Sequence, residues 1–125
     1  MRKIEYDLSK TGFNSIFKDW QLKAIEAIWA STSGVKSRVV TQQVNQSLKG
    51  RTISHTRVIH FLEDMREMGI ILGEDTRGKG GGYFVYHAKL DEEGFKRYIV
   101  EKMFSCLMCS FPEETREAIK RTLPF

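Results

Sequence analysis

The side chains best suited to chemistry in this sequence form one short polar group, in which Ser54, His55, Thr56 and Arg57 are followed one turn later by His60. An arginine guanidinium can donate two hydrogen bonds to the O6 and N7 atoms of guanine, and a threonine can contact a thymine methyl group or a phosphate. Histidine rings can donate to phosphates or to base edges. These residue types at the start of a helix indicate contact with the major groove of DNA, which admits one helix.

Two further groups of side chains suit the phosphate backbone of a nucleic acid. Gln42 and Gln43 precede the first group and are uncharged donors, which set register without reading sequence. Arg77 and Lys79 lie in a glycine-rich stretch, where the backbone can come close to a phosphate or to the minor groove. A nucleotide-binding loop would also contain glycines, but such a loop leads into a helix and this stretch joins two predicted strands.

The sequence contains no recognisable pattern for catalysis or for a metal site. We find no Ser/His/Asp order, no HExxH motif and no paired carboxylates, so we expect no enzyme and no catalytic residues. Cys106 and Cys109 form a C-x-x-C motif, but none of the three histidines lies next to it. We therefore interpret the cysteines as two buried small side chains and predict no cofactor and no metal. Sensing of a metal or of redox state by this pair is the alternative.

Helical periodicity predicts three helices before the glycine-rich stretch. The first covers residues 19–29, the second begins at Ser37 as N-cap and runs to residue 48, and the third runs from the N-cap Ser54 to Gly69. Their apolar positions recur at helical spacing: Leu22, Ile25, Ile28 and Trp29; Val40, Val44 and Leu48; Val58, Ile59, Leu62, Met65 and Met68.

Strand-like segments at residues 70–72 and 83–86 flank the glycine-rich stretch, so we predict a hairpin with a turn over residues 73–82. A helix begins near Asp91 and is stopped by Pro112, and a short helix covers residues 113–122. This order predicts a mainly α protein with a small β-hairpin, the winged helix-turn-helix. We assign residues 1–89 to a winged-helix domain and residues 90–125 to a helical extension.

The helix from Asp91 to Cys109 carries apolar residues on more than one face, more than a small winged-helix core can cover. A second copy of the chain is the simplest partner for that surface. We expect a homodimer whose contacts include Phe95, Ile99, Met103 and Leu107. A two-fold dimer would place two recognition helices about 34 Å apart and select a pseudo-palindromic site.

Composition is compatible with binding to a polyanion. The 20 lysines and arginines exceed the 16 acidic residues by four, and this surplus lies within residues 1–87, because residues 88–125 hold seven of each. No run of apolar residues approaches the roughly 18 to 20 that a membrane span needs, and the first ten residues carry charges where a signal peptide needs its apolar core. We expect a cytoplasmic protein without a membrane partner.

Residues 53–71, ISHTRVIHFLEDMREMGII, resemble the recognition-helix stretch of winged-helix repressors. The order of elements over about residues 17–110 looks like that of the penicillinase-repressor family, and multiple-antibiotic-resistance-type regulators are the second resemblance. The sequence lacks the Asn-Phe pair at which penicillinase repressors are cleaved. The resemblance implies that Ser54, Thr56 and Arg57 face DNA, that Arg77 and Lys79 belong to the wing, and that the helix from Asp91 pairs two subunits.

Two functional hypotheses follow. The first is a sequence-specific regulator that binds double-stranded DNA as a homodimeric repressor, with no small-molecule effector identified. The alternative is a winged-helix module for protein–protein interaction in a transcription or chromosome complex, which predicts little salt-sensitive affinity for any duplex.

Overall fold

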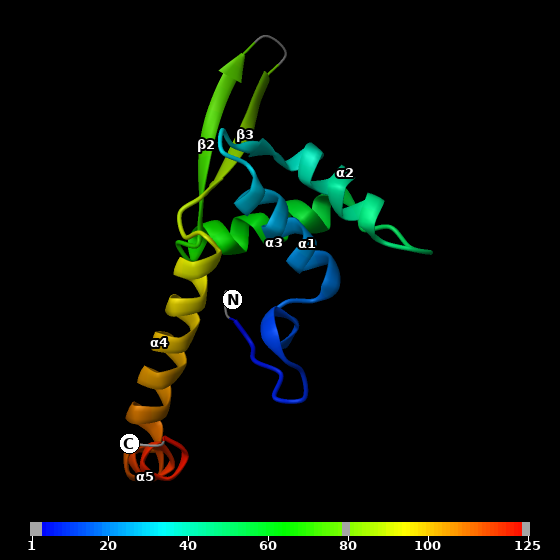
Figure 1. Ribbon diagram of the computed structural model, residues 1–125. Helices are drawn as coiled ribbons and strands as arrows, with labels where there is room; N and C mark the ends of the chain where they lie inside the picture. The colour runs from blue at the N-terminus through cyan, green and yellow to red at the C-terminus, as the bar shows by residue number, and fades with distance from the viewer. Residues whose placement is uncertain (1–3, 79–80, 124–125) are drawn as a thin grey trace. The chain divides into compact units, whose positions relative to one another are not determined.

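The computed structural model describes residues 4–78 and 81–123 and divides into two compact units, Met1–Leu90 and Asp91–Phe125. The first unit contains a 3-10 turn (Gly12–Ser15), α1 (Asp19–Ala30), β1 (Val35–Lys36), α2 (Ser37–Ser47), α3 (His55–Glu67), β2 (Ile71–Gly78) and β3 (Gly81–Ala88). The second contains α4 (Glu92–Ser110) and α5 (Pro112–Thr122) (Figure 1). The predicted class, mainly helical with a small antiparallel sheet in a winged-helix arrangement, is confirmed.

The three strands form one antiparallel sheet in the order β1-β3-β2. The prediction of a turn over residues 73–82 was wrong, because the ladder continues to the pair Gly78–Gly81. Polar and glycine residues break the alternation that marks a strand in sequence, but their backbone groups can still pair. The sequence also gave no signal for β1, whose two residues are too few to show a period.

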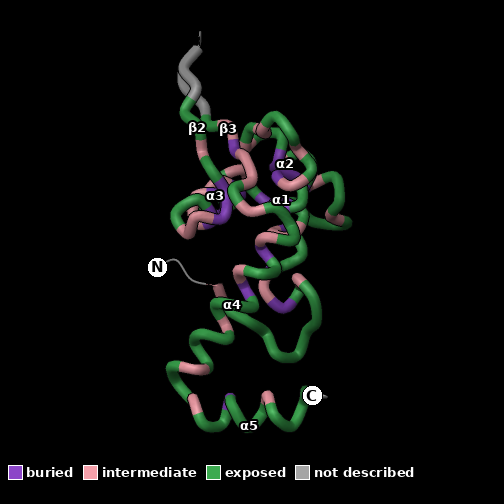
Figure 2. The backbone as a smooth tube through the Cα atoms, turned by 60° about the vertical axis from the view of Figure 1, so that its left-hand side comes forward, coloured by how far each residue is buried: buried purple, intermediate pink, exposed green. Residues whose placement is uncertain are grey.

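One apolar core joins α1, α2 and α3 to the base of the sheet, as the purple segments in Figure 2 show. The side chains with the least exposure, all at 1% or below, include Ile25, Ile28, Val40, Val44, Val58, Leu62, Ile70, Ile71 and Tyr86. Trp29, one of the apolar positions of the predicted first helix, is only half-buried, and its indole N–H donates to the Leu90 carbonyl at 3.0 Å. A polar N–H on a large ring finds a partner where the ring reaches the edge of the core.

Helix ends largely follow the predicted signals. The Ser54 hydroxyl accepts from the Arg57 backbone N–H at 3.2 Å and caps α3. Gly50 and Gly69 both have a φ of +79°, the left-handed conformation that lets the chain leave a helix. Ser37 is the first residue of α2 and not its N-cap, which is Lys36.

In the second unit, the Asp91 carboxylate caps α4 by accepting from the Gly94 N–H at 2.7 Å. Pro112 opens α5, and the Thr115 hydroxyl donates toward the carbonyls of Leu107 (3.1 Å) and Phe111 (2.6 Å). Both carbonyls also accept backbone N–H groups, Leu107 from Phe111 at 2.7 Å and Phe111 from Thr115 at 3.0 Å, so the hydroxyl adds a second donor where α4 meets α5. Within the described residues, no helix is both long and apolar enough to cross a bilayer.

The prediction that Cys106 and Cys109 are buried was wrong, because both thiols are exposed in the single chain. Their neighbours on α4 are apolar on several sides, so sequence alone did not indicate which side of the helix is covered. No three His, Cys, Asp or Glu side chains gather in a metal-binding arrangement within residues 4–78 and 81–123.

Candidate nucleic-acid interface

Helix α3 has one buried side and one exposed side. Val58, Phe61, Leu62 and Met65 are buried, with at most 6% of each side chain exposed. Thr56 and His60 are four residues apart on the opposite side, and both are exposed. We call these two residues the outward face of α3. The packed side fixes the rotation of the helix about its axis, so the direction of the outward face is fixed as well.

The turn that leads into α3 is held by the side chain of Asn45 on α2. Its Oδ1 accepts from the Ile53 N–H at 2.7 Å, and its Nδ2 donates to the Ile53 carbonyl at 3.1 Å. Ile53 is itself buried and directly precedes the N-cap Ser54. No local sequence pattern indicated this contact across eight residues. The amide sets where the first turn of α3 begins.

A groove runs between α2 and the start of α3. It is lined by Arg38, Thr41, Gln42, Asn45, Gln46 and His55. The predicted contact residues Gln42 and His55 therefore share one surface, whereas Gln43 is exposed but does not line the groove. His55 Nε2 lies 3.0 Å from the Ser37 hydroxyl, which holds the imidazole ring against α2.

Arg38 is a cation of this groove that sequence reasoning did not select. It is exposed in the first turn of α2, next to the uncharged Gln42. Its position one residue after the predicted start of the helix was the available signal. A guanidinium there can pair with a phosphate beside α3.

Arg57 leaves α3 on the side of α1 and not on the outward face. Its guanidinium carbon lies 5.5 Å from the centroid of the Trp20 ring, the range of a cation–π contact. The arginine is exposed, whereas Trp20 is only 5% exposed and packs edge-on against Phe61. Thus the predicted readout residue rests on a fixed aromatic surface.

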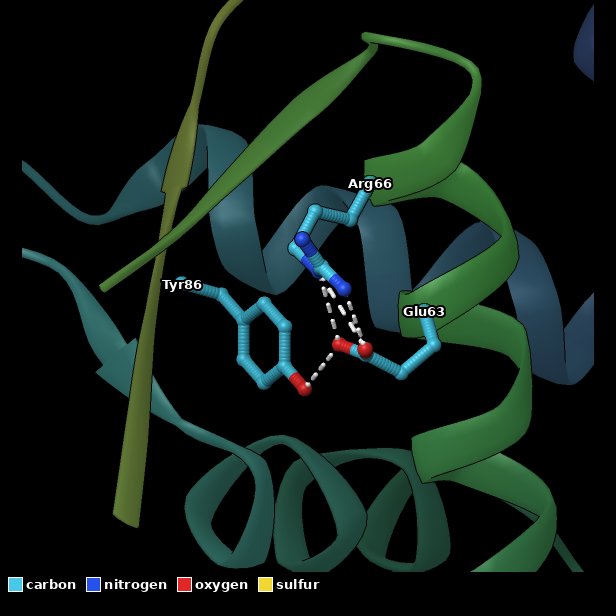
Figure 3. A network of polar contacts seen from close by, with 3 residues as sticks. All are labelled: Glu63, Arg66 and Tyr86. Atoms are coloured by element: carbon cyan, nitrogen blue, oxygen red, sulfur yellow. Dashed lines mark hydrogen bonds and ion pairs between the residues drawn. The ribbon is translucent and has the colours of Figure 1, made fainter. Parts of the chain in front are cut away.

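The far end of α3 is tied to β3 by three side chains, shown in Figure 3. Arg66 Nη2 donates to Glu63 Oε1 at 2.8 Å, and the Tyr86 hydroxyl donates to Glu63 Oε2 at 2.9 Å. The hydrogen bonds from Arg66 hold the pKa of Glu63 below its usual value. Burial, followed by the contact with Glu63, raises the pKa of Tyr86. The network joins α3 to the hairpin.

Arg66 also reaches the hairpin directly. Its guanidinium lies 5.9 Å from the centroid of the Phe84 ring on β3. Gly73 on the neighbouring strand β2 makes room for this side chain, because a Cβ atom there would lie 2.6 Å from Arg66 Cδ. The need for glycine at this position comes from close approach and not from a turn.

The wing is the β2–β3 hairpin, and the structure describes only part of the basic residues predicted for it. The backbone of Arg77 pairs with Gly82 in the ladder. The side chain of Arg77 and the whole of Lys79 lie outside the described residues. Their contact with DNA stays a prediction.

The predicted pairing surface on α4 divides into two sides. Phe95 is fully buried and Ile99 is 8% exposed in the single chain, so these two side chains leave little surface for a partner. Met103 is half-buried and Leu107 is 46% exposed. An exposed stripe contains Leu107 together with three residues that sequence reasoning did not select: Val100, Phe104 and Phe111. We call these four residues the apolar seam.

No protein-family model matches this chain, and no curated protein matches it. Among solved structures, the chain is similar to the crystal structure of a candidate transcriptional regulator from Thermoplasma acidophilum. The TM-score is 0.50 at 18% sequence identity, and the match covers 82% of this chain and 86% of the other. At this identity the likeness shows a shared fold.

Proposed function

We propose that this chain is a transcriptional regulator that binds double-stranded DNA through the outward face of α3. One observation carries the proposal: Thr56 and His60 are exposed opposite a buried face, on a helix that is fixed at both ends. Asn45 holds the start of the helix, and the contacts of Glu63 with Arg66 and Tyr86 hold its far half. A rigid helix with polar groups on its free side meets the requirement for reading base edges.

The groove beside α3 would carry the sequence-independent contacts. Arg38, Gln42 and His55 line it, and the first two suit phosphate oxygens. The first backbone N–H groups of α3 lie next to the Ser54 hydroxyl, and they favour an anion at this end of the groove. The solved structure with a similar fold is that of a candidate transcriptional regulator, and this supports the proposal. Membership of the penicillinase-repressor family stays a prediction.

Selection of bound duplexes from a random pool tests this function. We expect enrichment of a motif, with affinity for the enriched duplex falling steeply as salt rises, because phosphate contacts release counterions. Arg38→Ala should lower the slope of log affinity against log salt by about 0.9 if the arginine contacts one phosphate. Failure to enrich any duplex, with salt-insensitive binding to all of them, would contradict the proposal and favour the protein-interaction module.

We further propose that the regulator is a homodimer paired along the apolar seam of α4. Val100, Phe104 and Leu107 are spaced four and three apart on α4, so they occupy d, a and d positions of a heptad repeat, and Phe111 follows directly after the helix ends at Ser110. All four are exposed, from 46% for Phe104 and Leu107 to 66% for Val100. Phe104 and Leu107 also border an open groove, together with residues of α5. A surface of this kind marks an interaction site.

Charge complementarity supports a second copy as the partner. In this heptad Lys96 falls at g and Glu101 at the following e, positions that meet across a parallel pair of helices. Lys96 would then face Glu101 of the partner subunit, twice by symmetry. Its present contacts with Glu93 at 3.1 Å and Glu92 at 3.8 Å are exposed and contribute little, so exchanging them costs little.

Sedimentation equilibrium of Phe104→Ser tests the pairing. We expect the unsubstituted chain to be a dimer and Phe104→Ser to be a monomer at the same concentration. Leu72→Ser is the matched control, because Leu72 is 50% exposed but lies on β2, and it should stay dimeric. A monomeric unsubstituted chain, or an unchanged mass for Phe104→Ser, would contradict the pairing.

The sign of regulation is proposed to be repression, on the resemblance of residues 53–71 to winged-helix repressors. A reporter gene placed behind the enriched duplex tests it. Expression should fall when the protein is produced, and a rise would assign an activator.

A further inference from the structure

We infer that Arg57 binds the phosphate backbone beside α3, and that sequence is read by Thr56 and His60. The inference rests on the proposed function and divides its contact residues into two roles. The residue types alone favour the opposite assignment for Arg57, because arginine is the commonest partner of guanine.

The first argument is direction around the helix. Successive residues are rotated by about 100°, so Thr56 and His60 lie nearly in line opposite the buried side. Arg57 is one step away from that line, toward α1. When a helix lies in the major groove, its central line meets the base edges and its flanks meet the groove walls, which are made of phosphates. Direction therefore places Arg57 at a wall.

The second argument is the surface on which Arg57 rests. The guanidinium carbon lies 5.5 Å from the centroid of Trp20, and that ring is fixed by burial and by its edge contact with Phe61, with centroids 5.5 Å apart. A guanidinium that stacks on a ring keeps its N–H groups around its edge, so it can still donate two parallel hydrogen bonds to a phosphate. To reach a base edge, the Arg57 guanidinium would have to lose its contact with the Trp20 ring.

The surrounding groups are consistent with a wall position. Lys18 and Asp19, at the start of α1, are both exposed next to Trp20. The two charges have opposite signs, so this end of α1 adds no net charge beside Arg57. The phosphate is expected at the Arg57 guanidinium, over the Trp20 ring. A residue that is already held in place loses little conformational entropy when it binds.

The test compares each variant on the enriched duplex and on a scrambled duplex of equal length, over a series of salt concentrations. Arg57→Ala should weaken both duplexes by the same factor, leave their affinity ratio unchanged and lower the salt slope by about 0.9. Arg57→Lys should keep the slope, because the charge remains, and should bind both duplexes more weakly because the stacked fork is lost. Thr56→Ala and His60→Ala should each lower the affinity ratio by about tenfold or more, with little change in slope. Circular dichroism and thermal unfolding of each variant confirm that it is folded.

Each outcome decides between the roles. A fall in the affinity ratio of tenfold or more for Arg57→Ala, with an unchanged slope, would show a base contact and overturn the inference while DNA binding stands. Unchanged ratios for both Thr56→Ala and His60→Ala would overturn the assignment of readout. If the unsubstituted chain binds no duplex in a salt-dependent way, the proposed function fails and the role of Arg57 fails with it.

Discussion

Replacing Asn45 by alanine tests whether the α2–α3 turn is held as the structure indicates. The substitution removes two hydrogen bonds to Ile53, of 2.7 and 3.1 Å. Each contributes about 0.5–1.5 kcal/mol net, so the free energy of unfolding should fall by about 1–3 kcal/mol. Only 5% of Ile53 is exposed, which limits replacement of these bonds by water and favours the upper half of the range. A loss of about 2 kcal/mol corresponds to a fall in Tm on the order of 10 °C.

Urea unfolding followed by circular dichroism measures this loss, and two variants bracket it. Asn45→Asp keeps an acceptor for the Ile53 N–H but cannot donate to the carbonyl, so it should lose less stability than Asn45→Ala. Gln42→Ala, exposed on the same helix, should stay within about 0.5 kcal/mol of the unsubstituted chain. At temperatures where Asn45→Ala is still folded, its affinity for the enriched duplex should also fall, because the first turn of α3 is no longer fixed. If Asn45→Ala were as stable as Gln42→Ala, the role given to the Asn45 amide would be refuted.

Three further predictions follow from the same structure. Tyr86→Phe should cost about 1.5 kcal/mol near neutral pH, because it removes a hydrogen bond to a carboxylate. That bond helps to lower the pKa of Glu63 from its ordinary 4.5, so the stabilisation it provides is complete above pH 4.5 and is lost as the pH falls through the lowered pKa. In urea titrations from pH 7 to 3, the loss of unfolding free energy caused by Tyr86→Phe should therefore shrink. A loss that grows in acid would contradict this reasoning. Gly34→Ala should lower the unfolding free energy by at least about 1–2 kcal/mol, because Gly34 has a φ of +95° and a Cβ atom there would overlap Val85 and the His87 ring; thermal unfolding checks it, and an unchanged Tm would contradict it. Cys106 and Cys109 should both react with an aromatic disulfide reagent in the proposed dimer, because both are exposed in the single chain and neither belongs to the apolar seam; protection of either thiol would indicate a different pairing surface.

The helices of this fold could be predicted closely because their signals are local. The stripe of Val58, Leu62 and Met65 and the cap Ser54 lie within one helix, and all have the predicted burial or contact. The hairpin was predicted too short because strands are defined by pairing with another segment. The prediction failed at Gly73, which pairs with Tyr86 although it has no side chain to mark the alternation.

The candidate site could be predicted at the level of residue types but not at the level of contacts. The exposure of Thr56 and His60 follows from helical period once the apolar stripe is known. The contact of Arg57 with Trp20 does not follow, because it depends on how α1 packs against α3. On α4, the sequence showed apolar residues on several sides, and Phe95 was selected as a partner contact while Phe104 was not. The structure indicates the opposite choice, because Phe95 is fully buried and Phe104 is 46% exposed.

The contacts that fix α3 share one property, which explains why the candidate site needs the whole first unit. Asn45 reaches across eight residues to Ile53, and Glu63 reaches across 23 residues to Tyr86. Neither contact involves the outward face, yet both fix its direction, one through the turn and one through the hairpin. A substitution at either place should therefore change DNA affinity without touching a base. The two effects should add, because the contacts hold different parts of α3 and share no residue.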